Sequence, residues 1–224
     1  KYKLNKKIMC SRFENKETGI SIFEKLKKDS MGNFVYEITE DTNKINISPT
    51  NSIISVIRNK KTEYSIKNIY WGIQFDKQNQ SPLIFNSRIE TISGKIYWKQ
   101  LFAKNRCIIP ATAFYEWKEI EKTKIPHRIS LKNKELFFIA SIFLIQEDLT
   151  FSSMITTVPN KFVRQIHNRM PVLLNQNEAI DFLDADTEDA LKFCKPLPDN
   201  DEMDISIAED ILTQRQRDLL AKHK

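Results

Sequence analysis

The segment Leu136-Phe-Phe-Ile-Ala-Ser-Ile-Phe-Leu-Ile145 decides the fold class, because apolar residues run through it almost without interruption. A strand that is apolar on both faces is buried on both faces, so the segment predicts a strand in the centre of a sheet. His127–Leu131 precedes it across Lys132-Asn133-Lys134-Glu135. We expect these two segments to pair as a hairpin.

Other segments rich in β-branched and aromatic residues predict further strands, at Ile53–Arg58, Tyr64–Phe75, Arg106–Ile120 with an irregular corner at Pro110, and Phe151–Val158. Short helices are expected at Thr18–Lys28, from a cap at Asn160 to His167, at Asn175–Leu183, at Thr187–Phe193, and in the polar amphipathic tail Ala208–Lys224. Strands interleaved with short helices, without regular βαβ spacing, predict a single β-rich domain of the α+β class.

Composition narrows the class of protein. The 224 residues are 41% hydrophobic and 29% charged, and no apolar run approaches the length that crosses a bilayer. The apolar core of a secretory signal is missing after the N-terminal lysines. Three cysteines without a Cys-x-x-Cys pair argue against a disulfide framework and against a structural zinc site. We expect a cytoplasmic protein that uses no metal and no cofactor.

The net charge of +6 is unevenly distributed. Four lysines lie between Lys1 and Lys7, and residues 199–210 contain six acids and no base. Between Cys10 and Pro198 there are 27 lysines and arginines against 22 acids, which leaves +5. This charge is compatible with a polyanionic partner and equally with a solvated, mildly basic surface.

Cys10 follows Met9, and removal of Met9 would leave a cysteine with a free α-amino group. An amine and a thiol on adjacent carbons can attack one aldehyde carbon in turn, first as a Schiff base and then by closing a thiazolidine ring. With Lys1–Met9 attached, the amine is an amide and only the thiol remains. The alternative for a lone cysteine is a buried, inert side chain.

Asn86 and Arg88 stand two residues apart and would share one face of an extended segment. An amide and a guanidinium on one face can hold a sugar and a phosphate. The alternative is a polar loop with a surface pair between Arg88 and Glu90.

Glu116 is surrounded in sequence by Phe114, Tyr115 and Trp117. Burial would raise its pKa and make it a proton donor and acceptor near neutrality. The alternative places Glu116 on the wet face of an edge strand.

His167 and Arg169 lie between a short helix and an apolar strand, where a histidine can act as acid or base and an arginine can bind phosphate. The alternative is a structural histidine. His127 and His223 have no comparable neighbours in the sequence and are set aside. Trp71, beside Gly72, could form a shelf for an unstacked base. The alternative is a tryptophan packed in the core.

Taken in order, these segments resemble the SOS-response-associated peptidase (SRAP) family, of the type that shields abasic sites in single-stranded DNA. The resemblance covers roughly Cys10 to Leu183. It rests on Met9-Cys10-Ser11-Arg12-Phe13, Asn46-Ile47-Ser48-Pro49-Thr50, Trp71-Gly72, Asn86-Ser87-Arg88-Ile89-Glu90-Thr91, Arg106-Cys107-Ile108-Ile109-Pro110, Phe114-Tyr115-Glu116-Trp117 and His167-Asn168-Arg169-Met170-Pro171.

The resemblance implies a β-rich α+β domain of twisted, barrel-like sheets with short peripheral helices, spanning residues 10–224 with a divergent tail at 199–224. Residues 1–9 would then be a leader or a non-native extension. The implied partner is single-stranded DNA with abasic sites, bound by a monomer without metal.

The resemblance also implies the role of each site residue. Cys10 would form the crosslink, Glu116 would move protons to and from its amine, and His167 would assist opening of the sugar ring. Asn86 would orient Cys10 and the sugar. Arg12, Arg88 and Arg169 would hold phosphates, and Trp71 is added to the DNA-binding residues as the shelf for an unstacked base.

Three features depart from the family pattern: Ser11 stands where the family usually has glycine, the usual Asn-containing ending is not evident after Leu183, and eight residues precede Met9. Two alternatives to a crosslinking enzyme therefore stay open. One is a thiol autopeptidase that cleaves before Cys10, and the other is a DNA-binding module without covalent chemistry. The intact mass of wild type and of Cys10→Ala separates them. A mass that retains Lys1–Met9 favours the binding module, and loss of these residues from wild type but not from Cys10→Ala favours self-cleavage. Loss from both proteins favours a start at Met9 or processing by the host.

Overall fold

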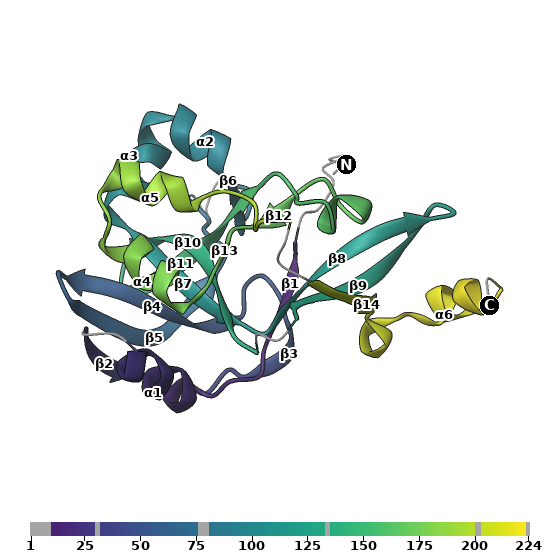
Figure 1. Cartoon of the computed structure of the whole chain (residues 1–224), viewed down its shortest axis with the longest axis horizontal. Coiled ribbons are helices and arrows are strands. Elements are labelled where there is room, and N and C mark those ends of the chain that lie inside the picture. The colour runs from purple at the N-terminus through teal and green to yellow at the C-terminus, as the bar shows by residue number, and fades with distance from the viewer. Residues whose placement is uncertain (1–9, 30–31, 76–80, 133–134, 200–202, 223–224) are drawn as a thin grey trace.

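The computed structural model describes residues 10–29, 32–75, 81–132, 135–199 and 203–222. In these residues the strands form two sheets, and short helices cover the larger sheet (Figure 1). The predicted leader at residues 1–9 lies outside the described residues. The β-rich α+β class is confirmed.

The larger sheet contains nine strands of the described chain. Its path is β12 (Met170–Pro171), β11 (Leu149–Thr157), β10 (Phe137–Gln146), β7 (Arg106–Ala111), β4 (Ser52–Lys60), β5 (Glu63–Trp71) and β2 (Asn33–Glu37), while β13 (Leu173–Leu174) pairs with β10 and β6 (Asn86–Arg88) pairs with β11. Strand β5 also pairs with β11, through Tyr70 opposite Phe151 and Trp71 opposite Ser152. This pairing closes β5, β4, β7, β10 and β11 into a ring, so the barrel-like expectation is confirmed.

The smaller sheet has the order β14 (Met203–Ile207), β9 (Thr123–Leu131), β8 (Ala113–Ile120), β1 (Arg12–Asn15) and β3 (Lys44–Ile47). Strands β8 and β9 form a hairpin whose turn residues Glu121 and Lys122 have φ values of 46° and 62°. Strand β14 was not anticipated from the sequence.

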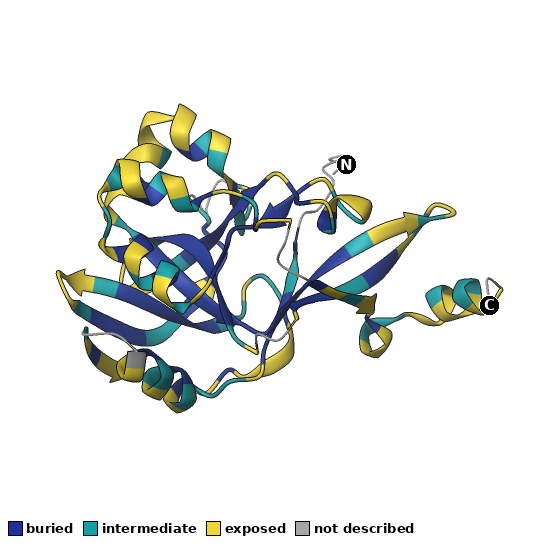
Figure 2. Cartoon of the chain, viewed as in Figure 1, coloured by how far each residue is buried: buried dark blue, intermediate teal, exposed yellow. Residues whose placement is uncertain are grey.

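The hairpin predicted between His127–Leu131 and Leu136–Ile145 is wrong. The first segment belongs to β9 of the smaller sheet, and the second belongs to β10 of the larger one. Strand β10 is nevertheless central, as predicted, because it pairs with β7 and β11 along its two edges. The apolar residues of β10 from Phe137 to Phe143 are buried, because the core between the sheets covers one face of the strand and helices cover the other (Figure 2). Ile145, near the end of the strand, is 60% exposed.

The corner predicted at Pro110 lies two residues later. Pro110 stays in β7 opposite Phe138, and the chain changes sheets at Thr112, whose N–H donates to the carbonyl of Glu14 at 2.7 Å. Strand β7 pairs with β4 only through Cys107 and Ile108, so the missing N–H of Pro110 falls where pairing with β4 has stopped. The sharp passage from β7 to β8 places Glu116 on the smaller sheet.

The helices are short. They comprise α1 (Gly19–Asp29), α2 (Ile89–Gly94), α3 (Ile96–Lys104), α4 (Gln176–Asp184), α5 (Thr187–Phe193), α6 (Gln214–Ala221) and the 3₁₀ segments η1 (Val163–Gln165) and η2 (Glu209–Ile211). The predictions of α1, α4 and α5 are confirmed to within a residue or two. In the described part of the predicted tail helix, residues 208–222, the α-helix covers Gln214–Ala221, and α6 extends away from the body (Figure 1). Helices α2 and α3 were not anticipated.

Trp71 ends β5 earlier than the predicted boundary at Phe75. Gly72 follows with φ +125°, where a Cβ would lie 2.8 Å from the side chain of Leu83, so this turn requires glycine. The Trp71 ring is completely buried, and its indole N–H donates to the carbonyl of Phe85 at 2.8 Å. It packs edge-on against Phe13 and Phe85 in the core between the two sheets.

No helix in the described part of the chain combines the length and the apolar character needed to cross a membrane.

Candidate active site

The site forms where the two sheets meet. Strand β1 pairs with β8, with Arg12 opposite Tyr115, and this register brings Cys10, just before β1, beside Glu116. On the larger sheet, Asn86 at the start of β6 lies opposite Met154 of β11, and Met170 of β12 lies opposite Thr157. Asn86 and His167, which lies three residues before Met170, therefore reach the seam between the sheets from the larger sheet.

Hydrogen bonds connect these side chains to the backbone of Cys10. The backbone N–H of Cys10 donates to Glu116 Oε1 at 2.8 Å. Asn86 Nδ2 donates to the carbonyl of Cys10 at 2.9 Å, and His167 Nδ1 lies 3.6 Å from Glu116 Oε1. Three of the residues predicted to be catalytic therefore gather around the fourth, Cys10: Glu116 and Asn86 bind its backbone, and His167 lies against Glu116.

Glu116 has no exposed surface, so the alternative that places it on a wet strand face is wrong. Burial raises its pKa to about 8, and the hydrogen bond from the Cys10 N–H opposes that shift only in part. Its Oε2 atom is buried and has no hydrogen-bond partner among the described residues. A carboxyl group in this state can hold or release a proton near neutral pH.

The Cys10 thiol is also buried. Burial raises its pKa well above the usual value, and the nearby Glu116 raises it further. Its Sγ lies 3.6 Å from the carbonyl of Arg12. The thiol is therefore held in its protonated form, and it is a weak nucleophile before any reaction at the backbone nitrogen.

His167 is positioned by the turn that precedes it. The side chain of Asn160 accepts from the N–H of Val163 at 3.0 Å, as predicted for a cap, and the His167 N–H donates to the Val163 carbonyl at 2.8 Å. The Arg169 N–H points at His167 Nδ1 at 3.3 Å. Nδ1 also lies 3.4 Å from the Arg169 carbonyl and 3.6 Å from Glu116 Oε1. Without hydrogen it accepts from the Arg169 N–H, and with hydrogen it can donate to the carbonyl or to the carboxylate.

Two of the predicted DNA contacts need correction. Trp71 cannot stack on a base, because its ring is enclosed by the core. Arg169 is largely buried and binds both carboxylate oxygens of Glu90 at 2.7 and 2.9 Å and the carbonyl of Thr156 at 2.7 Å. Its guanidinium fixes the start of α2 against β11 and is not available to a phosphate.

The other two predicted DNA contacts lie at the surface. Arg88 is exposed at the end of β6, two residues from Asn86. Arg12 is partly exposed, and its Nη1 donates to the carbonyl of Ser11 at 2.7 Å. The surface pair proposed between Arg88 and Glu90 does not form, because the Glu90 carboxylate binds Arg169.

Sequence reasoning missed His127. It lies directly opposite Glu116 in the β8–β9 hairpin. The position of the hairpin turn would have revealed it. Once Ile120 is opposite Thr123, the antiparallel register places Glu116 opposite His127. The sequence prediction assigned His127–Leu131 to a different hairpin and so could not see this pair.

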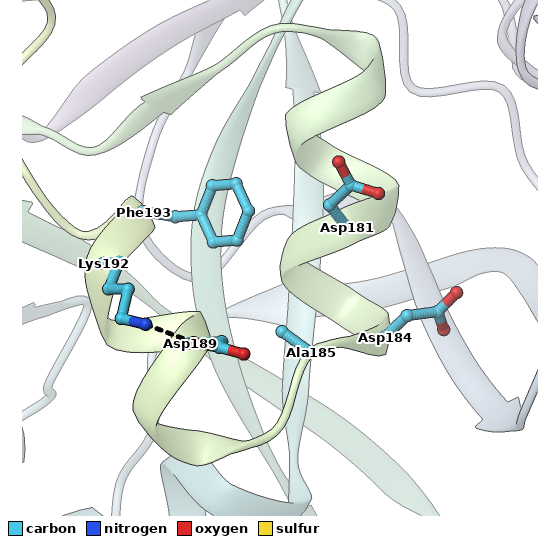
Figure 3. A pocket seen from close by; sticks show the side chains of 6 residues that line it. All are labelled: Asp181, Asp184, Ala185, Asp189, Lys192 and Phe193. Carbon is cyan, nitrogen blue, oxygen red and sulfur yellow. Dashed lines mark hydrogen bonds and ion pairs between the residues drawn. The ribbon is translucent and has the colours of Figure 1, made fainter.

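A separate pocket lies between α4 and α5 (Figure 3). It is lined by Asp181, Asp184, Ala185, Asp189, Lys192 and Phe193, and Lys192 is paired with Asp189. None of the predicted site residues lines it. Within the described residues, no three His, Cys, Asp or Glu side chains are grouped to hold a metal ion.

A model of the family described as SOS response associated peptidase (SRAP) matches residues 9–211. The chain belongs to the SRAP family. The resemblance seen in the sequence motifs is thereby confirmed, and the match includes every residue of the seam between the sheets.

Two bacterial proteins that are similar to this chain carry related names. The abasic site processing protein YoaM of Bacillus subtilis is 35% identical over 147 residues, which cover 62% of this chain and 64% of YoaM. The abasic site processing protein YedK of Escherichia coli is 24% identical over 179 residues, which cover 78% of this chain and 79% of YedK. The chain thus spans somewhat less than two thirds of YoaM.

Solved structures share the SRAP fold seen here. A crystal structure of a protein from Bacteroides thetaiotaomicron has a TM-score of 0.74 at 20% identity, covering 88% of this chain and 91% of that chain. A phage-related protein from Bordetella bronchiseptica has a TM-score of 0.68 at 19% identity, covering 89% of this chain and 94% of that chain. At these identities the likeness concerns the fold alone.

Proposed function

We propose that this chain, when Cys10 is its first residue, processes abasic sites in single-stranded DNA by forming a covalent thiazolidine with the sugar aldehyde. The observation that carries the proposal is the 2.8 Å contact between the Cys10 nitrogen and the buried carboxyl of Glu116. The names of YoaM and YedK agree with the choice of substrate.

The reaction begins at nitrogen. The neutral amine of Cys10 attacks the aldehyde carbon of the ring-opened sugar, and Glu116 transfers the two amine protons in turn to the oxygen, which leaves as water. The resulting C=N carbon then accepts the thiol sulfur. The S–H proton moves to the ring nitrogen, so the thiazolidine forms with loss of one water in total.

The order of attack follows from the electrostatics of the site. A thiol whose pKa is raised by burial is a poor first nucleophile, whereas an amine beside a proton acceptor is a good one. Asn86 holds the Cys10 carbonyl, which limits rotation of the residue that carries both reacting groups. His167, 3.6 Å from Glu116, would supply a proton to the sugar ring oxygen during opening.

DNA binding is assigned to backbone contacts. An abasic site offers no base to read, so recognition depends on phosphate and sugar. Arg88 and Arg12 are surface guanidiniums near Asn86 and Cys10 and suit this role. A covalent ring would hold the complex at salt concentrations that weaken phosphate contacts.

The test is crosslinking on a denaturing gel. A chain prepared to begin at Cys10 is mixed with a single-stranded oligonucleotide that carries one abasic site. We expect a DNA band that resists denaturation, none with Cys10→Ala, and none with a chain that retains Met9. A crosslink of equal yield with the Met9-retaining chain would contradict the proposal, because its nitrogen is an amide.

A further inference from the structure

His127 lies beside Glu116 on the core face of the smaller sheet. Residues directly opposite each other in an antiparallel pair project to the same face, with Cβ atoms about 4.5–5.5 Å apart. Glu116 and His127 form such a pair, and the next pair on the same face is Phe114 with Ile129. Because Phe114 and Ile129 are buried in the core that also contains Cys10, His127 faces the site.

On this face Glu116 has no exposed surface and His127 is partly exposed. In the next pair, Lys118 is exposed and Ile125 is buried. On the other side of His127, β14 presents Ile207, which cannot titrate. Among the described residues, the charged or titratable groups at this pair are Cys10 and His167 next to Glu116, and Lys118 on the same face. Lys124, opposite Glu119, is on the other face of the hairpin and acts on Glu116 through its charge.

The hydrogen bond of the imidazole fixes which nitrogen carries hydrogen. His127 Nδ1 lies 3.0 Å from the carbonyl of Ile125, and a carbonyl can only accept. Nδ1 therefore carries the hydrogen, and Nε2 of the neutral ring is a base. Burial lowers the pKa of His127, which keeps the ring neutral at pH 7.

The proposed reaction needs an exchange of protons with solvent. Glu116 takes a proton from the amine and gives one to the departing water, but its carboxyl is sealed from solvent. His167 contacts Glu116 and has a side chain that is only 9% exposed. His127 is the neighbour of Glu116 that also reaches the surface.

Resting on the proposed function, we propose that His127 is a positioning residue that exchanges protons between Glu116 and solvent. The neutral Nε2 takes the proton of the Glu116 carboxyl, directly or through one water, and the imidazolium then releases a proton to bulk water. Glu116 becomes a carboxylate and is ready to accept from the Cys10 amine.

The test uses the chain that begins at Cys10 and measures single-turnover crosslinking in dilute buffer from about pH 5 to 8, where histidine titrates. We expect His127→Ala to react about tenfold more slowly, a smaller loss than for a direct acid–base residue. Added imidazole should restore the rate of His127→Ala. It should not restore His127→Phe, whose ring fills the space.

Each outcome decides the matter. Equal rates and pH profiles for wild type and His127→Ala would overturn this inference and leave the proposed function intact. A slow variant that imidazole does not rescue would also overturn it, because the residue would then be structural only. Absence of any crosslink with wild type would overturn the proposed function and this inference together.

Discussion

The backbone nitrogen of Cys10 and the Oε1 atom of Glu116 are 2.8 Å apart, although 106 residues separate them in the chain. The contact joins a potential amine to a carboxyl whose pKa is raised to about 8. A proton acceptor with a pKa near the working pH is well matched to an amine that must lose a proton as it attacks.

Replacing Glu116 by glutamine should slow crosslinking, because the amide keeps the shape of the side chain and cannot transfer a proton. General acid–base residues contribute about 10²–10⁴-fold, and we expect a loss in that range. The measurement is the single-turnover rate of the chain that begins at Cys10. Wild-type rates for Glu116→Gln would show that the carboxyl is not used.

Glu116 should also make stability depend on pH in the chain that retains Met9. Its pKa is about 8 when folded against 4.5 as the ordinary value, so between these values the unfolded state releases a proton that the folded state keeps. Stability is then highest below pH 4.5 and decreases as the pH rises, by about 1.4 kcal/mol per pH unit at most.

Glu116→Gln does not titrate, so its free energy of unfolding relative to wild type should increase from pH 4.5 to about 8. Denaturant unfolding at several pH values measures this difference. Parallel curves for the two proteins would mean that Glu116 is ionised in the fold. In a chain that begins at Cys10 the effect should shrink, because an ammonium beside the carboxyl lowers its pKa.

Arg88 and Arg169 should behave differently on substitution. Arg88→Ala removes an exposed cation, and the salt dependence of single-stranded DNA binding should decrease by about 0.7 in slope, the value for one phosphate contact. Arg169→Ala removes the buried partner of Glu90 and should lower the Tm. Lys192→Ala, on α5, is the control for general charge loss. A salt slope unchanged by Arg88→Ala would remove Arg88 from the DNA contacts.

Glu14 should be essential for the stability of β1. Its buried carboxylate accepts from Arg128 at 2.6 and 3.1 Å, from Thr112 at 2.7 Å and from Tyr115 at 3.2 Å. Glu14→Ala leaves Arg128, whose side chain is 29% exposed, without its carboxylate, while Tyr115 and Thr112 keep backbone carbonyls as acceptors. We expect the free energy of unfolding to fall by about 1–3 kcal/mol. Glu24→Ala, on the exposed face of α1, should change it by about 0.5 kcal/mol or less. Similar losses for both variants would show that the Glu14 network is not stabilising.

Much of the secondary structure was predictable, because it depends on the residues within each segment. The apolar run of β10 predicted its central place, and Asn160 predicted the turn that leads to His167. Which strands pair was not predictable, because pairing depends on contacts between distant segments. The passage from β9 to β10 looks like a hairpin in sequence, yet the two strands end in different sheets.

The residue types of the site and the raised pKa of Glu116 were predictable, and the contacts of Arg169 and Trp71 were not. The motifs brought Cys10, Asn86, Glu116 and His167 to attention, and the structure brings them together. The sequence could not reveal that Arg169 binds Glu90 or that Trp71 is enclosed, since burial is set by tertiary packing. His127 escaped notice for the same reason, because its importance depends on the register of β8 and β9.

The most direct test of the account is the chemistry of the adduct at Cys10. The chain that begins at Cys10 is reacted with an abasic-site oligonucleotide, then denatured and treated with a thiol-alkylating reagent, and its mass is measured. The account predicts protein plus DNA minus one water, with alkylation at Cys107 and Cys194 and none at Cys10, because a thiazolidine has no free thiol. An adduct in which Cys10 is alkylated, or in which the DNA is attached to a lysine, would contradict it.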